Sequence, residues 1–208
     1  MELKKIILPL REALEEIGLT KPTTLQFETW SSLKSGMPCV LLAESGSGKS
    51  TALGMLLIQK LQKAEGESTR ALLLVPTKED VLRTVDLLRE MASRTNLRMF
   101  GVHEKGDIDY DKNQLSLGVD ILVGTPVKIN ALFSSAGFNL NTIRHFVVDD
   151  ADIIFKNRED SIVLRLLTSV DRTQLIYAAS TSSERFESMI DKTMEEPVYF
   201  DFTDEETY

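Results

Sequence analysis

Residues 43–51, with the sequence AESGSGKST, have the types and the spacing of a phosphate-binding loop. The glycines let backbone N–H groups converge on phosphate oxygens, and the dipole of a following helix would add to the attraction. Lys49 would reach the β- and γ-phosphates, and the Ser50 hydroxyl would be a ligand of Mg²⁺. An apolar run, residues 40–42, precedes the loop, and a helical pattern, residues 52–61, follows it. This order of strand, loop and helix predicts a nucleotide-binding site rather than a flexible surface turn.

Acidic residues directly after the apolar run 146–148 form a second group suited to chemistry. Asp149, at the end of an expected strand, would hold Mg²⁺, usually through water. Asp150 would polarise the attacking water. A cluster of this kind is otherwise a solvated turn or a helix cap, but the phosphate-binding loop upstream favours the catalytic interpretation. The expected catalytic residues are Lys49, Asp149 and Asp150, and the expected metal ligands are Ser50 and Asp149.

Short apolar runs alternate with helical patterns along the rest of the chain. The strand-like runs are residues 71–75, 97–102, 120–123, 145–148, 174–179 and 198–202. The helical patterns are residues 8–17, 23–33, 78–92, 162–170 and 183–194. This alternation predicts an α/β fold with a mostly parallel sheet and helices on both faces.

Residues 103–119 show no strong period, and we expect a short helix and a loop there. Asp107, Asp109 and Asp111 have the spacing that begins a calcium-binding loop, but the Gly and the distal Glu of that motif are missing. We therefore expect these aspartates to lie in a solvated loop.

The composition indicates a soluble globular protein of one domain. The 208 residues carry a formal net charge of −8, which argues against coating nucleic acid by bulk electrostatics but leaves a local basic groove open. The single cysteine, Cys39, excludes an internal disulfide and a cysteine metal cluster. The apolar runs have the length of strands, and the N-terminus lacks the features of a signal peptide. We expect a cytoplasmic location without membrane association.

Taken together, the motifs resemble the first RecA-like domain of a DEAD-box RNA helicase, over nearly the whole chain. Residues 18–26 resemble the Q motif, whose glutamine, here Gln26, reads the adenine edge. Residues 43–51 resemble motif I, and the Asp-Asp-Ala-Asp sequence at 149–152 stands where the family has Asp-Glu-Ala-Asp. The resemblance implies a RecA-like fold with ATP and Mg²⁺ as cofactors. The implied nucleotide-binding residues are Lys21, Gln26, Glu44, Ser45, Gly46, Ser47, Gly48, Lys49, Ser50 and Thr51.

Two further motifs resemble segments that contact the RNA backbone in this family. Residues 76–80 resemble Pro-Thr-Arg-Glu-Leu, and residues 125–128 resemble Thr-Pro-Gly-Arg. The implied RNA contacts are Pro76, Thr77, Lys78, Thr125, Pro126 and Lys128. Because these contacts are few and the net charge is negative, we expect RNA binding to be weak.

Several residues depart from the family pattern. Asp150 replaces the catalytic Glu and shortens the side chain by a methylene, which would move a general base away from its water. Ala178 and Ser180 stand in the Ser-Ala-Thr motif and lack one of its hydroxyls. Val127 replaces a Gly, and the lysines of both RNA motifs lack the arginine fork. The aromatic residue that packs by the adenine in the family would fall near Met1, where none is present.

The domain organisation leaves two functions open. Residues 1–202 are expected to form a single RecA-like ATP-binding domain and residues 203–208 an acidic tail, with no second helicase domain. In the family that second domain supplies arginines to the ATP site and half of the RNA clamp. The chain would then be a helicase domain with weak or partner-dependent hydrolysis, completed by a protein partner or a second helicase domain acting in trans. The alternative is a non-catalytic nucleotide-binding module. An unrelated P-loop kinase would leave Gln26 and the two RNA motifs unexplained.

Overall fold

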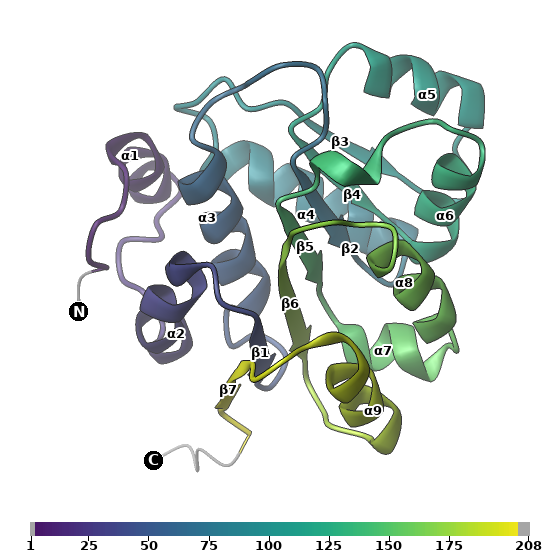
Figure 1. Cartoon of the computed structure of the whole chain (residues 1–208). Helices are drawn as coiled ribbons and strands as arrows, with labels where there is room; N and C mark the ends of the chain where they lie inside the picture. The colour runs from purple at the N-terminus through teal and green to yellow at the C-terminus, as the bar shows by residue number, and fades with distance from the viewer. Residues whose placement is uncertain (1–2, 204–208) are drawn as a thin grey trace.

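Residues 3–203 are described by the structure, a computed structural model, and contain one sheet in which neighbouring strands are parallel. The strands lie in the order β3-β4-β2-β5-β6-β1-β7 (Figure 1). They are β1 (Cys39–Leu42), β2 (Ala71–Leu74), β3 (Met99–Val102), β4 (Ile121–Gly124), β5 (His145–Val148), β6 (Gln174–Ala179) and β7 (Val198–Asp201). The predicted parallel α/β sheet is therefore confirmed.

Helices cover both faces of this sheet, as predicted. They are α1 (Leu8–Glu16), α2 (Thr24–Ser35), α3 (Lys49–Leu61), α4 (Lys78–Met91), α5 (Ile108–Ser116), α6 (Pro126–Ser134), α7 (Ala151–Lys156), α8 (Asp160–Leu167) and α9 (Glu184–Thr193), with a short 3₁₀ helix, η1 (Leu140–Thr142). Alternate residues of each strand enter different cores, because side chains alternate across a sheet. Leu41 and Leu73 pack with α1–α4, whereas Leu42 and Leu72 pack with α5–α9.

The strand order brings the chemically suited segments to one edge of the sheet. Strand β1 lies between β6 and β7, while the next strand of the chain, β2, lies beyond β6 and β5. Leu42 at the end of β1 pairs with Ala179 at the end of β6, and Leu74 pairs with Val148. The loops that follow these strands therefore leave the sheet at the same edge. In parallel sheets this edge, at the point where the strand order reverses, is where ligands bind.

Two helices, α6 and α7, were not predicted. Helix α7 has only six residues, too few for an apolar stripe to distinguish it in the sequence. Helix α6 begins directly at Pro126, which is favoured at the first helical position because its missing N–H is not needed there. The predicted short helix within residues 103–119 is α5, and its N-cap is Asp107, whose side chain accepts a bond from Tyr110 N.

Two expectations concern the ends of the chain and its relation to membranes. No helix within residues 3–203 combines the length and the apolar character that a bilayer crossing requires. The acidic tail, apart from Thr203, lies outside the described residues.

A buried carboxylate joins three strands at their N-terminal ends, opposite the strand ends from which the candidate site loops leave the sheet. Asp120, which precedes β4, is fully buried. It accepts bonds from Arg70, before β2, at 2.7 Å and from Arg98, before β3, at 2.9 and 3.1 Å. The backbone N–H groups of Arg98 and Glu65 also donate to it. Burial alone would raise the pKa of Asp120, but these bonds outweigh that effect and lower its pKa.

Replacing this carboxylate should strongly destabilise the fold. Asp120→Asn leaves two arginines without their buried partner, so we expect the free energy of unfolding at pH 7 to fall by about 3–5 kcal/mol. Urea unfolding measures the change, and Asp86→Asn, at an exposed position, should have little effect. Because the pKa of Asp120 is lower in the folded protein than in the unfolded chain, its ionised form stabilises the fold above pH ~3.9, the unfolded pKa. This contribution is lost as the pH falls through the folded pKa. The difference between wild type and Asp120→Asn should therefore narrow below pH ~4. A variant as stable as wild type at pH 7 would contradict this role.

Candidate nucleotide-binding site

The loop between β1 and α3 has the backbone shape of a phosphate cradle. Gly46 and Gly48 have φ values of +86° and +95°, which side chains of L-residues rarely adopt. A Cβ atom on Gly48 would also lie 2.7 Å from Gln26 Nε2. Helix α3 begins at Lys49, so its N-terminal N–H groups point toward this loop. The turn therefore favours glycine at both positions, and the close approach of Gln26 adds a second requirement at Gly48 alone.

Lys49 lies inside the loop and is 5% exposed. Its ammonium donates to the carbonyl oxygen of Ala43, to that of Glu44 at 2.8 Å and to Ser180 Oγ at 3.2 Å. Burial lowers the pKa of Lys49, and the carboxylates that follow β5 oppose this shift. The ammonium thus connects the loop to β6 and lies beside the position that phosphate oxygens would take.

Ser50 and Asp149, the two expected metal ligands, are in direct contact. The Ser50 hydroxyl donates to Asp149 Oδ2 at 2.5 Å, which joins the start of α3 to the end of β5. Asp149 is 3% exposed, and burial raises its pKa to about 6, although the bond from Ser50 opposes the shift. A divalent cation beside this carboxylate would offset the cost of its burial.

These residues fit a Mg²⁺–nucleotide complex rather than an all-protein metal site. Within residues 3–203, no group of three or more His, Cys, Asp or Glu side chains is placed to hold a metal ion. Mg²⁺ in nucleotide sites is held by few protein oxygens together with phosphates and water. The Ser47 hydroxyl oxygen is buried in the loop without a hydrogen-bond partner, so the cradle retains an unused polar group.

Asp150 occupies the turn between β5 and α7. Its backbone is left-handed, with φ 49° and ψ 45°, and its N–H donates to Asp149 Oδ1 at 3.1 Å. Aspartate tolerates this conformation better than most residues, though not without strain. Burial raises the pKa of Asp150, while Lys49 lowers it. The carboxyl is half-buried beside the cradle, where a general base would have to lie.

Thr181 is a site residue that the sequence analysis missed. Its N–H and its hydroxyl both donate to Asp152 Oδ2, at 3.2 and 3.0 Å. These bonds join the acidic group after β5 to the loop after β6. Ala178 has no hydroxyl with which to make such a link. The sequence signal for Thr181 was a hydroxyl residue directly after the motif at residues 178–180.

Gln26 connects the start of α2 to the phosphate loop. Its Oε1 accepts from Thr23 N at 3.0 Å, and its Nε2 donates to the Gly48 carbonyl at 3.3 Å. Thr23 Oγ1 in turn donates to the Ser47 carbonyl at 3.1 Å. An amide group has two donors and two acceptor lone pairs, so Gln26 keeps one of each for a ligand. Lys21 is exposed nearby, in the turn before α2.

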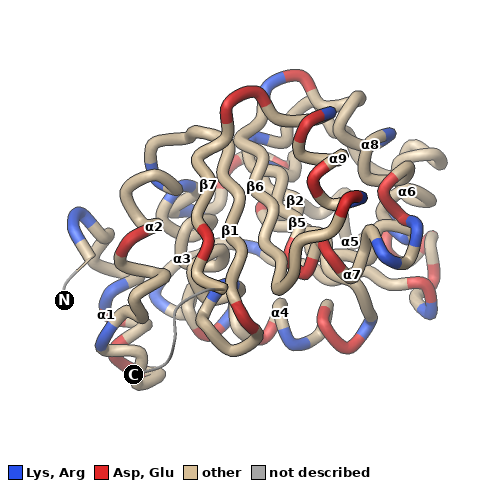
Figure 2. The backbone as a smooth tube through the Cα atoms, turned by 90° about the horizontal axis from the view of Figure 1, so that it is seen from below, with Lys and Arg blue, Asp and Glu red and all other residues tan. Residues whose placement is uncertain are grey.

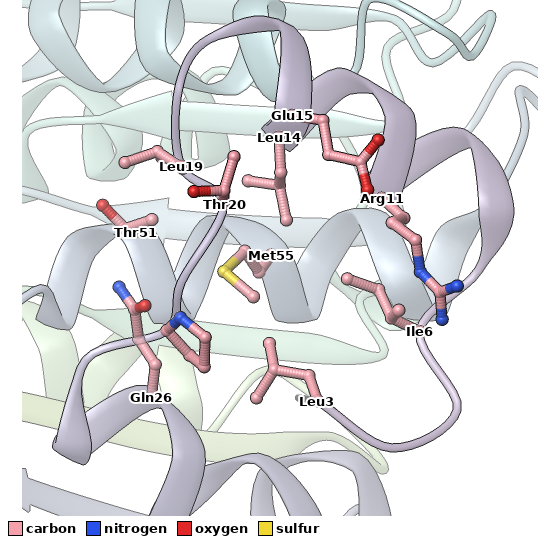
Figure 3. A pocket seen from close by; sticks show the side chains of 11 residues that line it. Leu3, Ile6, Arg11, Leu14, Glu15, Leu19, Thr20, Gln26, Thr51 and Met55 are labelled. Carbon is pink, nitrogen blue, oxygen red and sulfur yellow. The ribbon is translucent and has the colours of Figure 1, made fainter. Parts of the chain in front are cut away.

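A pocket of about 110 Å³ lies beside Gln26 and Thr51 (Figure 3). Figure 3 shows these two polar side chains at one end and Met55, from α3, in the middle of the pocket. Leu3 and Leu14 add apolar walls. Met1, near which the family's aromatic residue would fall, lies outside the described residues. The pocket combines a polar edge with apolar faces, which suits a purine base.

The two RNA motifs differ in accessibility. Thr77 is exposed and caps α4, while Pro76 and Lys78 are partly exposed. The second motif is mainly inside: Thr125, Pro126 and Lys128 are buried, and Val127 is 41% exposed. Figure 2 shows basic and acidic positions interspersed in the view from below.

Comparison with known proteins agrees with this arrangement. The model of the DEAD/DEAH box helicase family matches residues 23–189. The crystal structure of a DEAD box protein from Methanococcus jannaschii superimposes with a TM-score of 0.86 at 23% identity, covering 96% of this chain and 54% of that one. At this identity the likeness shows the RecA-like fold alone.

Curated relatives include the ATP-dependent RNA helicase DRS1 of Lodderomyces elongisporus, which is 25% identical over 91% of this chain. Nucleolar RNA helicase 2-B of Xenopus laevis is 29% identical over 68%, and the chloroplastic DEAD-box ATP-dependent RNA helicase 58 of Arabidopsis thaliana is 30% identical over 81%. The chain spans 29%, 18% and 38% of the lengths of these relatives. Because the family model covers well over half of the chain and includes the phosphate loop and the acidic motif, the chain belongs to the DEAD/DEAH box helicase family.

Proposed function

We propose that this chain is the ATP-binding domain of an RNA-directed helicase whose hydrolysis is weak alone and depends on a partner. The observation that carries the proposal is the pair of arrangements made by Lys49 and by Ser50 with Asp149. The Lys49 ammonium is buried in the loop, and the Ser50 hydroxyl is bonded to Asp149. Burying a lysine and an aspartate this deeply costs free energy, and the phosphates and Mg²⁺ of a bound nucleotide would offset that cost.

The proposed roles follow from the contacts. Lys49 and the N–H groups of residues 44–51 bind the phosphates, and Gln26 and the pocket beside it hold adenine. Ser50 and Asp149 would hold Mg²⁺, directly and through water, and that ion would neutralise charge on the β- and γ-phosphates. Asp150 orients the attacking water and accepts a proton from it. Its side chain is a methylene shorter than the family's Glu, so the alignment with water is expected to be poor.

The RNA part of the proposal rests on the accessible residues of the first motif. Pro76, Thr77 and Lys78 lie at the N-terminus of α4, where N–H groups favour phosphate oxygens. Relatives named RNA helicases support RNA as the nucleic acid. A second helicase domain, from a partner or from a longer chain, would supply the remaining contacts. A cytoplasmic location remains part of the proposal.

The second candidate function is a nucleotide-binding module that does not hydrolyse ATP. The observation that favours it is Asp150, which combines a shortened side chain with a left-handed backbone. Binding would then control contact with another molecule rather than drive unwinding.

Removing the lysine should strongly weaken nucleotide binding. For Lys49→Ala we expect a loss of ADP affinity of about 100-fold or more, since a charge-assisted bond contributes up to ~3 kcal/mol. Calorimetry with Mg·ADP measures the change, and Lys60→Ala, in the last turn of the same helix, is the control. Undiminished affinity in a folded Lys49→Ala would overturn the assignment of the loop.

Adenine should be preferred over guanine. The free donor and acceptor of Gln26 match the amino group and ring nitrogen of adenine, and guanine presents a carbonyl oxygen instead. We expect ADP to bind at least ~10-fold tighter than GDP, and Gln26→Glu, which cannot donate, to reduce that ratio. Competition binding with both nucleotides gives the ratio. Equal affinities in wild type would show that the Gln26 edge does not read the base.

Restoring the longer base should reveal how hydrolysis is limited. In the isolated domain, Asp150→Glu should give a small gain in ATP turnover, because no arginine of a second helicase domain stabilises the charge of the transition state. In a chimera with a second helicase domain of the family, the same change should give a much larger gain. Steady-state ATPase rates with RNA are measured for the wild type and Asp150→Glu, each as the isolated domain and as the chimera. The four rates separate the effect of the short base from that of the missing arginines. Turnover by the wild-type domain alone at the rate of a complete helicase would show that Asp150 is an adequate base.

A further inference from the structure

Asp111 and Lys128 form an ion pair in the interior, beside the proposed RNA-binding edge. The Lys128 ammonium lies 2.8 Å from Asp111 Oδ2, and the two side chains are only 6% and 5% exposed. The same ammonium donates to the Gly106 carbonyl at 2.6 Å. The expectation that Asp111 lies in a solvated loop is therefore wrong. Its carboxylate is buried and faces from α5 toward Lys128 on α6.

This pair takes the charge of Lys128 out of solvent. Lys128 is in the first turn of α6, at the position where the family motif has an arginine that contacts the RNA backbone. With a carboxylate and a carbonyl as partners, the ammonium points into the protein and its charge is neutralised. A buried ion pair is held tightly, because separating the partners leaves an uncompensated charge.

The surroundings do not replace the lost charge. The loop between β3 and α5 carries Glu104 and Lys105 on its exposed side, and Asp107 and Asp109 are exposed at the start of α5. These positions carry more negative than positive charge, so a phosphate approaching α6 would meet little attraction without Lys128.

We propose that Asp111 withholds Lys128 from nucleic acid and thereby sets how weakly this domain binds RNA. The inference rests on the proposed RNA-binding function. A phosphate can use Lys128 only by displacing the Asp111 carboxylate. Each phosphate of a single strand that a protein cation neutralises makes the slope of log affinity against log salt concentration steeper by about 0.7. Lys128 should therefore contribute nothing to that slope in wild type.

The test compares two substitutions that remove the same charge from the same helix. Asp111→Asn removes the partner of Lys128, and Asp109→Asn changes an exposed residue two positions away. Binding of a fluorescent single-stranded oligouridine is followed by anisotropy over a range of salt concentrations. We expect Asp111→Asn to bind several-fold tighter at low salt, with a slope steeper by about 0.7, and Asp109→Asn to keep the wild-type slope. Identical slopes for the two variants would overturn the proposal.

A second variant keeps the test decisive if Asp111→Asn folds poorly. Lys128→Gln should leave the salt slope unchanged from wild type, whereas a slope reduced by about 0.7 would show that Lys128 already neutralises a phosphate and would overturn the proposal.

A chemical readout tests the ion pair without RNA. Acylation of lysines by an amine-reactive ester, mapped by mass spectrometry, should label Lys128 far more slowly than exposed Lys105 in wild type. In Asp111→Asn, Lys128 should react at a rate near that of Lys105. Rapid labelling of Lys128 in wild type would overturn the ion-pair account. If no variant binds oligouridine at the lowest salt, the proposed RNA function fails, and the labelling result alone decides whether Asp111 holds Lys128.

Discussion

The burial of the Lys49 ammonium among loop carbonyls is the interaction on which the candidate site depends. Burying a lysine side chain costs free energy unless the N–H groups of its ammonium find hydrogen-bond acceptors. For Lys49 the acceptors are the carbonyls of Ala43 and Glu44 and the Ser180 hydroxyl oxygen. These contacts fix the loop, the start of α3 and the end of β6 relative to one another. Phosphate oxygens can take over the same donors, so the loop is arranged for an anion before one arrives.

The parallel sheet makes this arrangement possible and also separates two sides of the molecule. The order β5-β6-β1 brings Asp149, Ser180 and the phosphate loop together at the carboxyl edge. The strands β2 and β4, farther along the sheet, present the two RNA motifs at the same edge. On the nucleotide side, the polar groups are directed toward the cradle. On the side of β4, Lys128 is instead paired with Asp111 inside the protein. The two sides of the sheet thus differ in the partner of their buried lysine, which is a set of loop carbonyls for Lys49 and a carboxylate for Lys128.

Local patterns in the sequence predicted most of the sheet and the turn of the phosphate loop, because both depend on residues that are close along the chain. The run from Val40 to Thr51 specifies strand, turn and helix by itself. The sequence could not reveal what depends on distant pairing. Asp111 was expected in a solvated loop because its partner, Lys128, lies on another helix. The role of Thr181 likewise depends on the packing of two loops that follow different strands. Helix α7 escaped notice because it is shorter than two turns.

The most direct test of the central claim compares a ligand with phosphates to one without. Calorimetric titration of the unaltered chain with ADP and with adenosine, both in the presence of Mg²⁺, separates the phosphate loop from the base pocket. The account predicts a single site for ADP and an affinity for adenosine lower by about 100-fold or more, because the contacts to Lys49 and to the N-terminus of α3 carry most of the binding free energy. Binding of adenosine as tight as that of ADP, or no binding of ADP, would contradict it.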